Sequence, residues 1–172
     1  MWRKIVIACM VLICFVLQST LMKWIALGNV APNLLIIITA AYGFMRGKKS
    51  GLLVGFFCGL LTDIFFGEVI GFYALIYMYI GYGNGFFNRI FFKEDIKLPL
   101  FLIALSDLFY GFVVYVLLFL LRGRFAFGYY MTNVILPEMI YTIVLTFIIY
   151  PINLKINRKF DEIEKRSEKK FV

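Results

Sequence analysis

Three acidic residues lie inside apolar runs, and their side chains are the ones in this chain whose type could do chemistry at membrane depth. They are Asp63, Asp107 and Glu138. A carboxylate in hydrocarbon is costly and must find a partner, so each suggests a function. Together with Tyr73, which shares a helix face with Tyr77, they form the predicted buried polar site.

Three roles compete for these carboxyls. The first role is the binding of a cation or a polar ligand. The second is general acid–base catalysis, and the third is that of hydrogen-bonded structural groups. The structural role includes packing against a partner protein. Asp107 lies beside Ser106 and four residues before Gly111, which favours a helix contact, and Glu138 follows Pro137 near an expected helix start.

Enzyme chemistry finds little support in the residues. The chain has no histidine, which removes the commonest general base and metal ligand together with any Ser–His or Cys–His pair. Its three cysteines lie in apolar runs without metal-site spacing. We therefore predict a protein that is not an enzyme, with no catalytic residue, no cofactor and no metal site.

Glycines recur at four-residue spacing in two places. Gly51, Gly55 and Gly59 are followed by Asp63 at the same interval, which places all four on one slowly winding stripe of a helix. Small residues on one stripe let another backbone approach closely inside a membrane. Gly81 and Gly85 repeat the spacing and indicate a second packing face rather than a phosphate loop. The stripe predicts a packing surface, within the bundle or against a partner chain, and Asp63 needs a partner from one of the two.

Composition sets the class of protein. Hydrophobic residues make up 63% of the 172 and charged residues 16%. The hydrophobic fraction is well above that of soluble domains, and the charged fraction is well below it. We predict an all-α polytopic membrane protein. The net charge of +8 would suggest nucleic acid for a soluble protein, but these charges lie at the ends of the apolar runs, where they set topology. No nucleic-acid partner is expected.

Six membrane spans are the natural count. They are predicted at residues 5–21, 30–45, 51–66, 72–87, 98–121 and 134–155. We expect a transmembrane domain over residues 1–155 and a charged tail over residues 156–172, either solvated or touching membrane lipids. With the N-terminus in the cytoplasm, fifteen of the 18 Lys and Arg residues lie inside, so both termini are predicted to be cytoplasmic.

Several motifs, in this order and spacing, resemble the family of the bacterial rod-shape-determining protein MreD. The resemblance covers nearly the whole chain and is most specific over residues 32–89. The motifs are Pro32-Asn33-Leu34-Leu35, the turn Arg46-Gly47, Gly51, Gly55 and Gly59 leading into Leu60-Leu61-Thr62-Asp63, Gly67 with Gly71, Gly81-Tyr82, Leu136-Pro137 and Tyr150-Pro151. Family members usually carry Asp where this chain has Asn33.

The resemblance implies a non-enzymatic membrane subunit of the cell-elongation machinery, in the bacterial cell membrane. Its implied partners are MreC, the actin-like MreB, RodA and a class B penicillin-binding protein, which build lateral peptidoglycan. The implied fold is similar to the S components of energy-coupling-factor transporters. The alternative function is a substrate-binding subunit of a small-molecule transporter, with a polar cavity lined by residues such as Asp63, Tyr73 and Glu138.

Overall fold

The protein is built from helices. The computed structural model describes residues 2–25, 30–90, 96–120, 123 and 126–168, and within these ranges it contains no β-strand. The elements are α1 (Trp2–Ile25), α2 (Leu34–Arg46), α3 (Lys48–Phe66), α4 (Phe72–Asn84), the 3₁₀ segment η1 (Gly85–Ile90), α5 (Lys97–Leu118), α6 (Phe127–Tyr130), the π-helical segment η3 (Met131–Ile135) and α7 (Leu136–Glu168).

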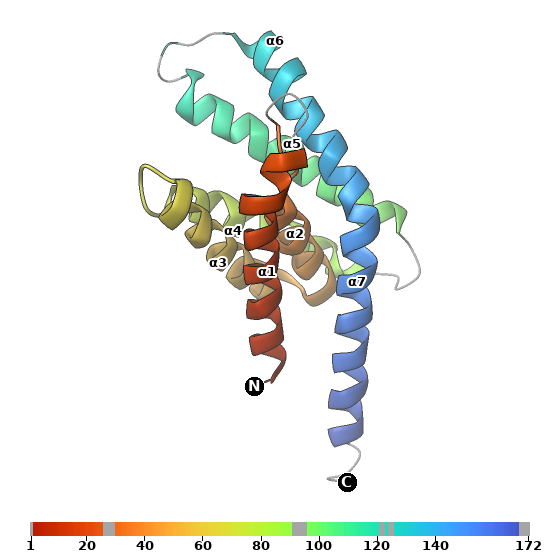
Figure 1. Cartoon of the computed structure of the whole chain (residues 1–172). Helices are drawn as coiled ribbons and strands as arrows, with labels where there is room; N and C mark the ends of the chain where they lie inside the picture. The colour runs from red at the N-terminus through yellow and green to blue at the C-terminus, as the bar shows by residue number, and fades with distance from the viewer. Residues whose placement is uncertain (1, 26–29, 91–95, 121–122, 124–125, 169–172) are drawn as a thin grey trace.

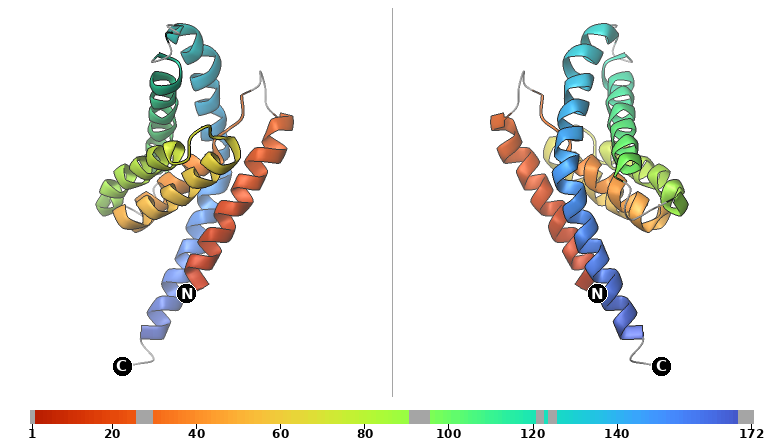
Figure 2. Two further views of the ribbon diagram at one scale, coloured as in Figure 1. Left: turned by 90° about the vertical axis from the view of Figure 1, so that its left-hand side faces the viewer. Right: turned by 90° about the vertical axis from the view of Figure 1, so that its right-hand side faces the viewer.

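Four helical segments are long and apolar enough to cross a membrane: Arg3–Thr20, Lys48–Phe66, Lys97–Leu118 and Phe127–Ile163. Helices α2 and α4 coincide with predicted spans but have 13 residues each, a rise of about 20 Å against a hydrocarbon core of about 30 Å. Figure 2 shows α3 and α4 steeply inclined to the long axis of α7. The membrane-protein class therefore holds, and the six-span count stays a prediction.

Helix α2 forms the centre of the bundle. Every residue from Leu34 to Met45 is buried, and α1, α3, α4, α5 and α7 all contact this helix. Its continuous apolar run, LLIIITAAYGFM, suits a helix that is covered on every side. Asn33 caps its first turn, because the Asn33 side chain accepts a hydrogen bond from the backbone N–H of Ile36 (3.2 Å).

The last long helix begins close to where the sequence predicted, and other helical segments precede it directly. Proline lacks the N–H that would bond to the preceding turn, so Pro137 was expected to mark a helix start close to Glu138. Helix α7 does begin at Leu136, and Glu138 lies in its first turn. The short helix α6 and the π-helical segment η3 come directly before it, because a widened turn accommodates the proline without breaking the chain's helical course.

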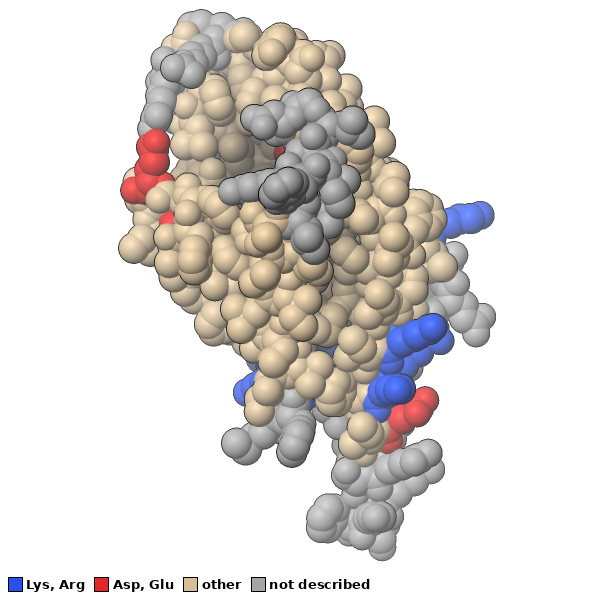
Figure 3. Space-filling view, viewed as in Figure 1, with Lys and Arg blue, Asp and Glu red and all other residues tan. Residues whose placement is uncertain are grey.

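The two ends of the described chain lie at the same end of the molecule (Figure 1), and α7 continues as a helix through the charged residues to Glu168. Arg3 donates hydrogen bonds to Asp161 (2.9 Å) and Asn157 (2.7 Å), and Arg46 donates to Asp161 (2.8 Å). These four residues, which we call the terminal clasp, join α1, α2 and α7. The lysines and arginines visible in Figure 3 gather on the half of the molecule that holds both termini. We call the opposite end, which carries α6, the distal end.

Candidate functional site

The glycine stripe on α3 is covered by α4. A Cβ atom added at Gly51 would meet the Gly81 carbonyl, one added at Gly55 the Tyr77 carbonyl, and one added at Gly59 the backbone of Ala74. All of these are backbone atoms, which cannot move aside as a flexible side chain can. The α3–α4 pair accordingly forms the most extensive helix contact in the described structure.

The second glycine pair packs in the same way. A Cβ atom added at Gly81 would meet the backbone of Gly51, and one added at Gly85 the backbone of Lys48 at the start of α3. Gly43 of α2 also lies against the Gly81 carbonyl. Three helices thus approach one another closely where their glycines meet, and none of these glycine faces is left open to another protein.

Asp63 finds its partners in its own chain. Its carboxylate accepts three backbone hydrogen bonds, from Gly71 (2.9 Å), Tyr73 (2.8 Å) and Ala74 (3.0 Å). These N–H groups lie at the start of α4, where a helix has donors without intrahelical acceptors. The N-cap residue itself, Gly71, adopts a left-handed conformation (φ 102°) and has no side chain to cap the helix. Asp63 therefore caps α4 from the end of α3, and its partner is not supplied by another chain.

A network of polar side chains crosses the interior between α2, α4 and α7. Tyr77 donates its hydroxyl proton to the Asn33 side-chain oxygen (2.8 Å), and the backbone N–H of Asn33 donates to Thr142 (3.1 Å). Thr142 in turn donates to the backbone carbonyl of Glu138 (2.9 Å). The Glu138 carboxyl lies within interaction range of the Asn33 amide and of Asp107.

Asp107 on α5 has the least satisfied side chain of the predicted site. Its exposed fraction is 3%, and neither carboxyl oxygen has a hydrogen-bond partner in the described structure. The Thr142 hydroxyl is close to Asp107, but its proton is donated to Glu138. Asp107 and Glu138, far apart in the sequence, thus form a pair of neighbouring carboxyls inside the bundle.

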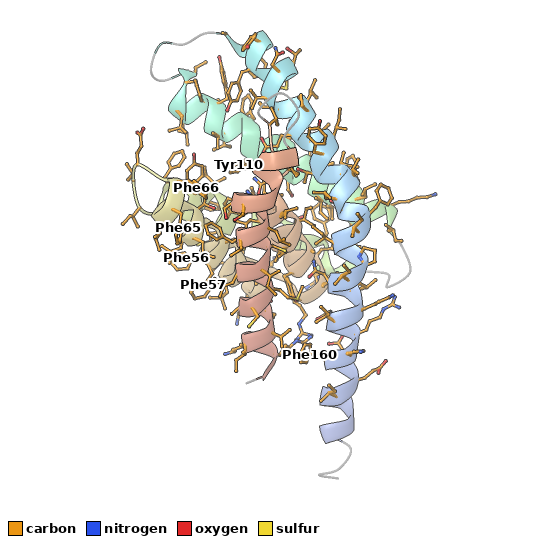
Figure 4. All side chains as sticks on the ribbon, in the orientation of Figure 1. Phe56, Phe57, Phe65, Phe66, Tyr110 and Phe160 are labelled. Atoms are coloured by element: carbon orange, nitrogen blue, oxygen red, sulfur yellow. The ribbon has the colours of Figure 1, made fainter. Side chains whose placement is uncertain are left out.

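Three tyrosines adjoin this carboxyl pair. The rings of Tyr77 and Tyr110 are 5.4 Å apart between centroids, and those of Tyr73 and Tyr110 are 6.3 Å apart. Both Tyr77 and Tyr110 lie within electrostatic range of Asp107 and Glu138. Figure 4 labels Tyr110 on α5, toward the α3–α4 hairpin. We call the set of Asp107, Glu138, Tyr77, Tyr110 and Asn33 the polar chamber.

The structure places the predicted site residues in two groups. Asp107, Glu138 and Tyr73 lie at the polar chamber, whereas Asp63 is engaged with the backbone at the start of α4, one turn away from the Tyr77 side chain along that helix. The chamber holds hydrogen-bond acceptors and aromatic faces, a composition that suits a positively charged group. No group of three metal-ligating side chains gathers within the described ranges.

Three members of the chamber, Asn33, Tyr77 and Tyr110, and one residue beside it, Thr142, were not among the predicted site residues. Asn33 carried a signal as a helix-start residue after Pro32, and Tyr110 and Thr142 are spaced at one helical turn from Asp107 and Glu138, respectively. The sequence could show that Tyr110 and Thr142 each lie on the same helix face as a carboxyl. It could not show that these faces of α5 and α7 meet each other and the start of α2.

Two apolar grooves lie on the outside of the bundle. The larger, about 510 Å³, runs between α1 and α3 and is lined by residues that include Val11, Leu12, Leu53 and Phe57. The second, about 400 Å³, lies between α4 and α5 and is lined by residues that include Tyr79 and Leu105. Neither groove includes the carboxyl pair.

Comparison with known proteins gives one match. The family model described as rod shape-determining protein MreD matches residues 2–160. No curated protein and no solved structure matches the chain. The match takes in every element from α1 to most of α7, including the glycine stripe and the polar chamber.

Proposed function

The chain belongs to the rod shape-determining protein MreD family, and from that premise we propose that it is a non-enzymatic scaffold of the cell-elongation complex in the bacterial cell membrane. The family match over residues 2–160 is the observation that carries the proposal. A role in rod shape determination follows from the family, and membrane residence follows from the family together with the four apolar helices. The proposed partners are MreC, MreB, RodA and a class B penicillin-binding protein.

The packing of α3 favours its outer side, rather than its glycine face, as the surface that contacts these partners. The glycine face of α3 is occupied by α4, so partner helices must use a different face. The opposite side of α3 carries Phe57, with an exposed fraction of 57%, at the edge of the α1–α3 groove. Figure 4 shows Phe56 and Phe57 projecting from α3 on this side. We propose the α1–α3 groove as the seat of a partner's membrane helix.

The cytoplasmic side of the proposed scaffold is the end that carries both termini. Its lysines and arginines fit the greater positive charge of cytoplasmic segments, and the helical extension of α7 projects there. In this proposal the extension and the basic turns contact cytoplasmic partners or anionic lipid headgroups.

A photo-crosslinking residue placed at Phe57 tests the scaffold proposal in native membranes. Matched positions are Leu105 in the α4–α5 groove and Phe147 on the exposed side of α7, with exposed fractions of 52% and 57%. We expect Phe57 to crosslink to another membrane subunit, with MreC co-purifying. An absence of protein crosslinks at all three positions, with no co-purification of elongation proteins, would contradict the proposal.

A further inference from the structure

The carboxyl pair in the polar chamber lacks a positive partner in the described structure. Asp107 is almost fully buried and neither of its oxygens is hydrogen-bonded. Arg3 and Arg46 are paired with Asp161 at the opposite end of the molecule. An ionised carboxylate is strongly destabilised when it is buried without a partner, so Asp107 needs either a proton or a positive group that the described chain does not provide.

Glu138 makes the requirement stronger. It lies within electrostatic range of Asp107, and two neighbouring carboxylates repel each other unless a positive charge or a shared proton stands between them. Unlike Asp107, Glu138 is partly accessible. Figure 3 shows a hollow in the surface on the distal half of the molecule. Because Glu138 is partly exposed, the pair is reachable from outside the bundle.

The remaining chamber residues select the chemistry of the missing group. Tyr77 and Tyr110 present aromatic rings 5.4 Å apart, and aromatic faces attract organic cations. The Tyr77 hydroxyl proton is already donated to Asn33. Ca²⁺ takes about six to eight oxygen ligands, more than two carboxyls and one amide supply. An ammonium group needs only a few acceptors and gains from the rings.

We propose that the polar chamber binds a protonated primary amine, with Asp107 and Glu138 as its hydrogen-bond acceptors and Tyr77 and Tyr110 as its aromatic wall. The amine belongs either to a small molecule that enters through the hollow or to a lysine side chain of a neighbouring membrane protein. This inference is independent of the scaffold role, because cell shape and subunit association are measured without reference to the chamber.

The first arm of the test uses the purified full-length chain in lipid nanodiscs, with benzylammonium as the probe and benzyl alcohol as its neutral counterpart. We expect the midpoint of thermal unfolding to rise and saturate with benzylammonium but not with benzyl alcohol. Asp107→Asn and Glu138→Gln should each abolish the response. Both replacements conserve shape, and Asp107→Asn removes an unpaired charge, so both variants are expected to fold. Glu162→Gln, an exposed carboxyl on the α7 extension, should respond as the wild type does.

The second arm distinguishes the source of the amine. A carbodiimide that couples carboxyls directly to amines is applied to native membranes, and peptides that contain Asp107 or Glu138 are examined by mass spectrometry. A saturable response in the first arm assigns the site to a small amine. A crosslink to a lysine of another chain, with no response in the first arm, assigns it to a partner side chain. Neither response nor crosslink would overturn the proposal and leave the carboxyls as protonated structural groups.

Discussion

At the scale of single residues, Asp63 is a carboxylate that is costly to bury in hydrocarbon and that has a structural role as the cap of α4. Its position on the glycine stripe predicted that it needed a partner, and that expectation came from the chemistry of a carboxylate in hydrocarbon. The identity of the partner was not predictable, because it depends on the path of the Gly67–Gly71 turn. That turn brings the start of α4 back to the end of α3, so three backbone N–H groups surround one carboxylate.

Replacement of Asp63 by Asn should destabilise the protein. The amide keeps one acceptor oxygen but turns an N–H₂ group toward backbone donors, so at least one of the three hydrogen bonds is lost. Because Asp63 is 1% exposed, water cannot replace the lost bond, and the expected cost is about 1–3 kcal/mol. Loss of monodisperse protein on heating in mild detergent measures the effect. Glu162→Gln, at an exposed carboxyl on α7, is the control and should behave as the wild type does.

For Asp107, the sequence predicted the helix contacts of its neighbours but not the surroundings of its own carboxyl. Its neighbours Ser106 and Gly111 suggested a helix contact, and both do contact other helices: Ser106 accepts a hydrogen bond from Asn84 (2.7 Å) and Gly111 lies against Ile135. Within the described residues, the Asp107 carboxyl between them accepts no hydrogen bond. Its proximity to Glu138 depends on how α5 and α7 cross, which no local pattern encodes.

At the scale of elements, the glycine spacing was the most informative signal in the chain. Gly51, Gly55 and Gly59 predicted a close-packed face, since a four-residue repeat keeps small residues on one side of a helix. The spacing alone did not decide whether that face meets another helix of the same chain or a partner protein. The short turn after α3 decides it, because α4 folds directly back onto the stripe.

Two glycine-to-alanine replacements should have effects of opposite sign. Alanine favours a helix over glycine by roughly 1 kcal/mol. At Gly83 an added Cβ meets nothing within 4 Å, so Gly83→Ala should leave stability unchanged or raise it. At Gly55 the Cβ meets the Tyr77 carbonyl, so Gly55→Ala should lower the midpoint of thermal unfolding. If Gly55→Ala were as stable as Gly83→Ala, the close packing of α3 on α4 would be refuted.

At the scale of the whole molecule, the sequence predicted an all-helical membrane protein, and both parts of that prediction are confirmed. Charge and hydropathy suffice to predict this class of protein, because they reflect the solvent around the chain rather than the packing of its helices. Long-range contacts such as the terminal clasp could not be predicted from the sequence. Arg3 and Asp161 are separated by almost the full chain, and their pairing depends on the start of α1 lying against the C-terminal part of α7.

The terminal clasp should contribute a salt-sensitive part of the stability. Asp161 accepts from two arginines, but its side chain is 23% exposed, so the pairs are screened and worth at most about 1 kcal/mol. Asp161→Asn should lower the unfolding midpoint at low ionic strength and have a smaller effect in concentrated salt. The neighbouring Glu162→Gln serves as the control. An effect of Asp161→Asn that grows with salt would contradict the clasp.

The orientation of the bundle is a prediction of the same scale. Fluorescent proteins that fold only in the cytoplasm, fused separately to each terminus, should both be fluorescent. A periplasmic enzyme reporter inserted at Glu68 should be active if the α3–α4 turn faces outward, as the six-span plan requires. Fluorescence from only one terminus would show that the number of spans is odd.

Cell shape measured in a strain that depends on this chain tests most directly whether the close-packed bundle carries the shape-determining role. Depletion of the protein should convert rods into wide, rounded cells. Wild-type protein and Gly83→Ala should restore rod width, whereas Gly55→Leu, which forces a large side chain into the α3–α4 contact, should not. Rods of normal width after depletion, or full rescue by Gly55→Leu at normal expression, would contradict the account.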